Sequence, residues 1–209
     1  MNPEYKLCKN LADEIADQVR LSPRLYDTFC QIPRTIFVPM KNCAFTLDPS
    51  PISGGQWISS PLTVAKMTMA LEAENCDNIL EIGCGSGYQA AILSRLAHRI
   101  FSVERISSLA SSAKEHIKSL NINNVNILFA DGNSGWKSFA PYERIILSCA
   151  CEEVPKALFD QLKDNGILVA PIKNPDGIQK ITKFVKTNNG LIKKELDTCD
   201  FVPLKSGRE

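Results

Sequence analysis

The chain has 209 residues, of which 44% are hydrophobic and 22% are charged, and its 24 Lys and Arg residues nearly balance 23 Asp and Glu residues, which leaves a formal net charge of +1. This length and apolar content predict a single domain, residues 1–209, with one sizeable core. The near-zero charge argues against nucleic acid as the main partner, and no stretch approaches the ~20 apolar residues of a membrane-spanning helix.

The N-terminal residues and the cysteines indicate a compartment. Residues 1–20 mix charged and apolar side chains without the apolar run of a signal peptide, so we expect a cytoplasmic protein. Eight cysteines lie scattered along the chain, which predicts reduced thiols rather than disulfides. Only Cys149 and Cys151 are close in sequence, and neither His98 nor His116 is near them, so we expect no metal site.

Helices are predicted for most of the first forty residues. Leu11, Ile15 and Val19 recur at four-residue spacing, and Pro23 begins a second short helix that runs through Phe29. These helices are expected to cover one flank of the core.

The segment from Pro39 to Ser60 differs from the preceding residues in composition. Several prolines and the Gly54-Gly55 pair interrupt regular structure, so we predict a loop of about twenty residues, of the kind that is usually functional or disordered. Ser60 and Pro61 then fit the N-cap and the first position of a helix.

Short apolar runs and helical stretches alternate through the rest of the chain. Strands are predicted at 78–82, 100–103, 125–129, 144–148 and 166–172, with helices at 89–97 and 109–120 between them. This alternation predicts βαβ units and a doubly wound, mostly parallel α/β sheet with helices on both faces. Two further strands, at 180–186 and 191–196, flank Asn188-Asn189-Gly190, which favours an antiparallel hairpin and brings the sheet to seven strands.

A glycine-rich turn follows the first of these strands, in Ile79-Leu80-Glu81-Ile82-Gly83-Cys84-Gly85-Ser86-Gly87-Tyr88. Missing side chains at three alternate positions let a ligand approach the backbone and the N-terminus of the next helix. Taken alone, the turn also fits a tight strand-to-helix connection.

Two more strand ends carry acidic residues. The second strand ends at Glu104, about twenty residues beyond the first glycine, where a carboxylate is placed to accept hydrogen bonds from both hydroxyls of a ribose. Taken alone, Glu104 also fits an exposed carboxylate that pairs with Arg105. Asp131 and Gly132 follow the third strand, so all these features lie at the carboxyl edge of the sheet, where ligands of open α/β sheets bind.

The spacing of the glycines narrows the choice among nucleotide-like ligands. The turn has the form G-x-G-x-G, whereas dinucleotide sites have G-x-G-x-x-G, so NAD is the second choice. No Lys-Ser or Lys-Thr pair follows the glycines, which argues against a nucleoside triphosphate. The pattern resembles the S-adenosylmethionine site of Rossmann-like methyltransferases.

A longer stretch, Glu-Ile-Gly-Cys-Gly-Ser-Gly-Tyr-Gln-Ala-Ala at 81–91, resembles the protein-L-isoaspartate O-methyltransferases. The segments 32–39, 103–106, 131–136, 161–171 and 201–204 resemble other parts of that family, so the resemblance extends from about residue 30 to residue 204. It implies that S-adenosylmethionine is bound by Glu81, Gly83, Gly85, Gly87, Glu104, Asp131 and Gly132.

The segment Pro51-Ile-Ser-Gly-Gly-Gln-Trp-Ile-Ser-Ser-Pro61 is similar to the family's loop before its next helix. On that match Ser59 is the catalytic position, and Gln56, Ile58, Ser59 and Ser60 contact substrate. Ser59 read without the resemblance is a polar loop residue beside a helix cap, for which Ser60 is the better candidate. Ser53 stands where the family commonly has glycine and Trp57 where it commonly has threonine, and both departures bear on the choice of acceptor.

The resemblance implies methyl transfer from S-adenosylmethionine to the free α-carboxylate of L-isoaspartyl residues in damaged proteins, which starts repair through a succinimide. The expected partners are isoaspartyl-containing proteins or peptides, with neither nucleic acid nor membrane, and a monomer is the expected state. Two alternatives stay open: a methyltransferase with another acceptor, either a small molecule or RNA, and a relative that binds the cofactor without catalysis.

Overall fold

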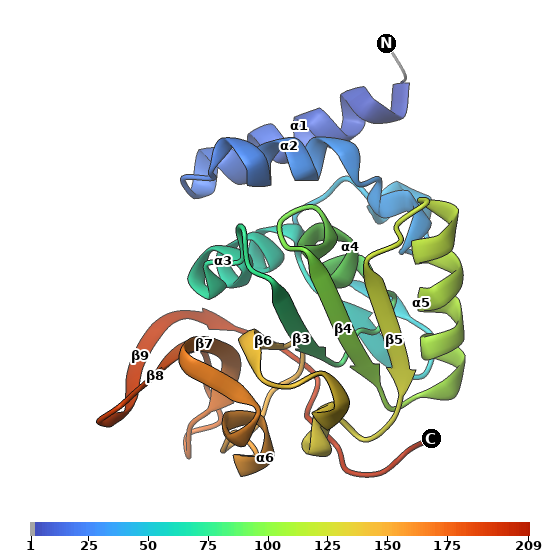
Figure 1. Ribbon diagram of the computed structural model, residues 1–209. Helices are drawn as coiled ribbons and strands as arrows, with labels where there is room; N and C mark the ends of the chain where they lie inside the picture. Colours follow the sequence, from blue (N-terminus) through green and yellow to red (C-terminus); the bar gives the residue numbers. More distant parts are fainter. Residues whose placement is uncertain (1–2) are drawn as a thin grey trace.

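The computed structural model describes residues 3–209. Its first two helices, α1 (Pro3–Gln18) and α2 (Pro23–Gln31), pack against each other and form an outer layer above the other helices (Figure 1). Leu11 and Ile15 are buried, as their spacing predicts. The Ser22 hydroxyl caps α2 by accepting a hydrogen bond from the Leu25 backbone N–H.

The prediction of a loop over residues 39–60, after these helices, is wrong. The segment contains a 3₁₀ turn (Lys41–Cys43) and a small antiparallel hairpin of β1 (Ser50–Ile52) and β2 (Gln56–Ile58). Gly54 and Gly55 both have positive φ, 67° and 63°, and this conformation lets the chain reverse within three residues. We call residues 50–58 the β1–β2 hairpin.

The main sheet has seven strands, as predicted. In spatial order it runs β5-β4-β3-β6-β7-β8-β9, with the first five strands parallel and β8 and β9 each antiparallel to its neighbour. Thr187 pairs with Gly190 across a two-residue connection, which confirms the predicted Asn-Gly hairpin. The strand bounds are β3 (Asn78–Ile82), β4 (Arg99–Glu104), β5 (Val125–Phe129), β6 (Tyr142–Leu147), β7 (Leu162–Lys173), β8 (Gln179–Thr187) and β9 (Gly190–Cys199).

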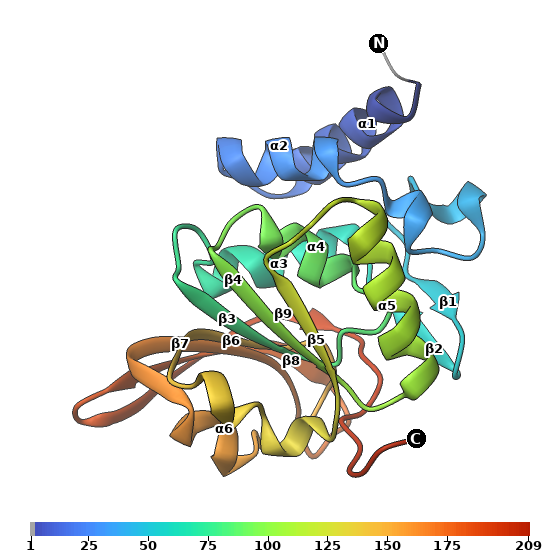
Figure 2. The same ribbon diagram turned by 45° about the vertical axis from the view of Figure 1, so that its right-hand side comes forward.

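Helices cover the two faces of this sheet unequally. One face packs against α3 (Pro61–Leu71), α4 (Tyr88–Ser94) and α5 (Ser107–Ser119), and the outer layer of α1 and α2 lies over α3 and α4 (Figures 1 and 2). The other face is covered by the short α6 (Lys156–Asp160) and by two 3₁₀ turns, Gly132–Ser134 and Lys137–Phe139. Helix α6 was not predicted, because five residues are too few to show helical periodicity.

The strand order reverses beside β3. The chain continues from β3 to β4 on one side and later returns to β6 on the other, so the carboxyl end of β3 is the switch point at which open α/β sheets bind ligands. The glycine-rich turn occupies that point.

Two further observations concern the cysteines and the helices. All eight cysteines are free thiols in the structure. No helix among residues 3–209 combines the length and the apolar content needed to cross a bilayer.

Candidate active site

The glycine turn is held by hydrogen bonds to neighbouring backbone. Gly83 donates its N–H to the Val103 carbonyl at 2.8 Å, and Gly87 donates to the Cys84 carbonyl at 2.8 Å. Gly83, Gly85 and Gly87 have φ values of 83°, 53° and 90°, a region that side-chain-bearing residues rarely adopt. The turn therefore presents bare backbone at the end of β3.

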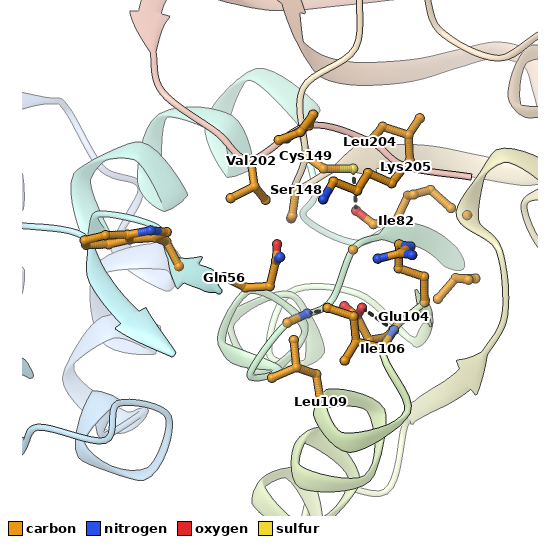
Figure 3. Close-up of a pocket in the computed structure, with 17 residues that line it drawn as sticks. Gln56, Ile82, Glu104, Ile106, Leu109, Ser148, Cys149, Val202, Leu204 and Lys205 are labelled. Carbon is orange, nitrogen blue, oxygen red and sulfur yellow. Dashed lines mark hydrogen bonds between the residues drawn. The ribbon is translucent and has the colours of Figure 1, made fainter. Parts of the chain in front are cut away.

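Glu104 is tied to this turn from the end of β4. Its carboxylate is buried and accepts hydrogen bonds from the Gly85 N–H at 2.8 Å and from the Ile106 N–H at 2.9 Å (Figure 3). Arg105 pairs with Glu209 rather than with Glu104, so the simple ion-pair interpretation of Glu104 is wrong. A carboxylate has about four lone-pair sites, so both oxygens keep room for a further donor.

A pocket opens between the glycine turn and the C-terminal segment. Gln56 reaches into it from β2, while Leu204 and Lys205 close another side (Figure 3). Its walls are largely apolar. We call this the glycine-turn pocket; its lining residues are Gln56, Trp57, Ile82, Gly83, Gly85, Val103, Glu104, Arg105, Ile106, Leu109, Gly132, Ser148, Cys149, Val202, Pro203, Leu204 and Lys205.

A second, inner pocket lies on the other side of the turn, towards α3 and α4. It brings Ile58 and Ser59 of the hairpin region to Glu81, Ser148 and the glycine turn. The two pockets share Trp57, Gly83, Gly85 and Ser148, so they are neighbouring parts of one site.

Glu81 is fully buried at the floor of the inner pocket. It accepts a hydrogen bond from the Ser102 hydroxyl and a longer one, 3.4 Å, from the Ser148 hydroxyl. Burial raises the pKa of Glu81 to about 7, although the bond from Ser102 lowers it, and the negative charge of Glu104 raises it further.

Ser59 and Ser60 have different partners. The Ser60 side chain caps α3 by accepting from the Leu62 N–H at 3.2 Å, which confirms it as the helix cap. The Ser59 hydroxyl forms no hydrogen bond with the residues described, 3–209, and Ser59 lines both the inner pocket and a wider opening beside it. We call this opening the outer groove; it is lined by Pro49, Trp57, Ser59, Ser148, Asp200, Phe201 and Val202.

Three of the predicted site residues, Gly87, Asp131 and Ser60, line none of these openings. A Cβ atom at Gly87 would come within 3.3 Å of Ala113, so this glycine allows α4 to start close against α5. Asp131 accepts from the N–H groups of Asn133 at 2.9 Å and Gly207 at 2.7 Å, and so holds the C-terminal segment in place.

Arg34 was missed by reasoning from the sequence. It is fully buried, and its guanidinium donates to the carbonyls of Cys43 (2.9 Å), Asp48 (2.9 Å) and Ser59 (3.2 Å). Burial lowers the pKa of its guanidinium. One side chain therefore ties both ends of the β1–β2 hairpin to the body of the protein. A charged residue within the apolar run Ile32-Pro-Arg-Thr-Ile-Phe-Val is the only sequence signal of this role.

Comparison with known proteins identifies the family. The family model for protein-L-isoaspartate(D-aspartate) O-methyltransferases matches residues 6–209. The chain is 48% identical to a protein-L-isoaspartate O-methyltransferase of Helicobacter pylori (strain P12), covering 94% of this chain and 95% of the relative. It is 40% identical to that of Dictyoglomus turgidum, covering 97% and 93%. The chain belongs to this family.

Solved structures agree with that placement. A protein-L-isoaspartate O-methyltransferase superposes with a TM-score of 0.87 at 26% identity, over 95% of this chain and 66% of that one. A Plasmodium falciparum structure described as a putative protein-L-isoaspartate O-methyltransferase, in complex with S-adenosyl-L-homocysteine, superposes with a TM-score of 0.82 at 24% identity, over 98% and 99%. The predicted Rossmann-like fold, O-methyltransferase class and S-adenosylmethionine cofactor are confirmed.

Proposed function

We propose that this protein-L-isoaspartate O-methyltransferase transfers a methyl group from S-adenosylmethionine to the free α-carboxylate of L-isoaspartyl residues in damaged proteins and peptides. The position of Ser59 carries the proposal, because this residue lines both the outer groove and the inner pocket beside the glycine turn. A carboxylate that enters through the groove meets a free hydroxyl donor next to the place where a nucleotide-like ligand would bind.

The site fits S-adenosylmethionine in three respects. The glycine turn exposes backbone, the Glu104 oxygens are placed for a ribose, and Ile82, Ile106 and Leu109 supply apolar walls for a purine. When bound, this cofactor would supply a sulfonium methyl group whose carbon a carboxylate oxygen attacks in line, with S-adenosylhomocysteine leaving as the neutral thioether.

The protein's own contribution is to position the acceptor. An α-carboxyl has an intrinsic pKa of about 3.3 to 3.7, so the nucleophile is already ionised at neutral pH and needs no general base. We propose that Ser59 donates a hydrogen bond that orients the carboxylate, and accurate alignment of this kind supplies roughly 7 to 11 kcal/mol of barrier reduction. The β1–β2 hairpin lies over the pockets and would exclude water from them.

The resulting methyl ester would begin repair by closing to a succinimide. We propose that the partners are damaged proteins in the cytoplasm and that the enzyme acts as a monomer. The eight free thiols are in keeping with a reducing compartment.

A methyl-transfer assay with matched isoaspartyl and aspartyl peptides tests the proposal. We expect transfer to the isoaspartyl peptide alone, because the aspartyl carboxylate sits one methylene differently relative to the main chain. An RNA pool serves as the competing acceptor. Equal rates on both peptides, or transfer to RNA and to neither peptide, would overturn the proposed acceptor. Turnover with any acceptor removes the non-catalytic alternative.

A further inference from the structure

The outer groove is the wider of the two openings that Ser59 lines, and under the proposed function the acceptor enters through it. It has a volume of about 360 Å³ and shares Trp57 and Ser148 with both pockets. A carboxylate held at Ser59 therefore leaves the neighbouring residues of its peptide in the groove.

The charge of the groove is negative. Asp200 is the only charged residue that lines it within residues 3–209, and its exposed carboxylate forms no hydrogen bond or ion pair with them. The nearby Asp197 is different, since it pairs with Lys66 at 2.9 Å. The unpaired Asp200 carboxylate repels the acceptor carboxylate, which every isoaspartyl peptide carries. A peptide without a neighbouring positive charge to offset this repulsion therefore binds less well.

The backbone beside Asp200 is held firmly. Phe201 donates its N–H to the Gln179 side chain at 2.8 Å and accepts from it at 3.0 Å. Val202 accepts from the Ala150 N–H at 2.8 Å. The position of Asp200 relative to the groove is therefore set by the fold and not by a free tail.

Trp57 faces the same groove from the hairpin. Its side chain is 54% exposed, and its indole has no aromatic partner among the described residues. An exposed indole face attracts cations, and most strongly so among the aromatic side chains. The indole of Trp57 and the carboxylate of Asp200 therefore both attract a positively charged group of a ligand.

We propose that Trp57 and Asp200 form a subsite for a cationic side chain, so that the enzyme prefers isoaspartyl acceptors with a lysine or arginine next to the isoaspartyl residue. This preference rests on the proposed function, since it concerns the same acceptor. A neighbouring cation stacks on the indole, pairs with Asp200 and cancels the repulsion that Asp200 exerts on the acceptor carboxylate.

Six isoaspartyl peptides in two sets of three test the subsite; the varied residue precedes the isoaspartyl residue in one set and follows it in the other. Within each set it is lysine, norleucine or glutamate, and kcat/KM is measured at low and at high salt. We expect kcat/KM to be about three- to thirtyfold higher for lysine than for norleucine, mainly through KM, with glutamate lowest. High salt should shrink the preference, since exposed charges are screened.

Substitutions of single residues test whether Asp200 and Trp57 cause the preference for the lysine peptide. Asp200→Asn should lower the lysine-to-norleucine ratio towards one and raise the rate on the glutamate peptide, and Asp197→Asn, the paired acid nearby, should leave the ratio unchanged. Trp57→Leu should also lower the ratio. Binding of the lysine peptide in the presence of S-adenosyl-L-homocysteine should shift the fluorescence of Trp57, which lines the groove. The change can be assigned to Trp57, since the other tryptophan, Trp136, packs against Phe101 and Phe139.

The outcomes separate the two proposals. Equal kcat/KM for lysine, norleucine and glutamate in both sets of peptides, or a lysine preference that survives in Asp200→Asn, overturns the subsite and leaves the proposed function standing. Failure to methylate any isoaspartyl peptide overturns both.

Discussion

At the end of β4, Glu104 has a structural role in the glycine turn and an expected role in binding the cofactor. It fastens the glycine turn through Gly85 and the start of α5 through Ile106, and its oxygens face the pocket in which the cofactor ribose is expected. A loss of cofactor affinity on mutation therefore has a direct part, from the lost ribose bonds, and an indirect part, from a looser turn.

Replacement of Glu104 by alanine should weaken S-adenosylmethionine binding. A hydrogen bond to a charged group is worth about 1.5 to 3 kcal/mol, so we expect a roughly ten- to two-hundredfold rise in the dissociation constant, measured by calorimetry. Glu115→Ala, an exposed carboxylate on α5, serves as the control and should bind normally. Unchanged affinity in a folded Glu104→Ala protein would remove this residue from the site.

Ser59 tests the acceptor side of the mechanism. Ser59→Ala should leave cofactor affinity nearly intact and lower kcat/KM for an isoaspartyl peptide by roughly ten- to two-hundredfold, because one hydrogen bond to the carboxylate is lost. Near-total inactivity would indicate a covalent role instead. The exposed Ser111, on α5 and outside the pockets, is the control, and Ser111→Ala should retain its rate.

At the scale of elements, the β1–β2 hairpin depends on Arg34. The hairpin has only three-residue strands, which do not hold together without support, and the buried guanidinium bonds the carbonyls on both sides of it. The glycines at its tip let it turn, and Arg34 fixes where it lies.

Arg34→Met should therefore release the hairpin and destabilise the fold. Each buried carbonyl left unsatisfied costs about 1 to 3 kcal/mol, so we expect a large drop in the free energy of unfolding in urea and faster proteolysis within residues 43–59. Arg34→Lys should rescue little, since an ammonium lacks the planar fork that reaches several carbonyls. Arg99→Lys, at an exposed ion pair with Asp77, is the control and should change stability little.

At the scale of the whole molecule, the burial of Glu81 makes stability depend on pH. Its pKa rises from an ordinary value of 4.5 to about 7 in the folded state because burial disfavours the charge. Below pH 4.5 the group is protonated in both states and has no effect. Between pH 4.5 and 7 the unfolded chain loses a proton that the folded chain keeps, so stability falls as pH rises, and above pH 7 the loss is complete.

Comparison with Glu81→Gln isolates this effect in the cofactor-free protein. The free energy of unfolding of the wild type relative to the variant should fall by about 3 kcal/mol between pH 4.5 and 7 and then stay level. Urea unfolding across that pH range provides the measurement, and Glu115→Gln should give a flat difference. A flat difference for Glu81→Gln as well would mean that the folded protein stabilises the ionised carboxylate.

Local patterns in the sequence determined much of this protein. The seven strands of the main sheet, the Ser60 cap and the Asn-Gly hairpin all depend on residues a few positions apart, and these predictions are confirmed, whereas the short β1, β2 and α6 were missed. The glycine turn and Glu104 were also predicted together, because parallel strands place their carboxyl ends at one edge. The whole chain as one domain stays a prediction.

Only the tertiary structure decided which of these residues face the site. It showed that Gly85 lines both pockets, whereas Gly87 packs against α5 and Asp131 holds the C-terminal segment. It also revealed the carbonyl partners of Arg34 and the groove that Asp200 and Trp57 both line. The reason is physical: a sequence pattern reports on neighbours along the chain, while burial, hydrogen-bond partners and cavity walls depend on atoms that folding brings together from distant segments.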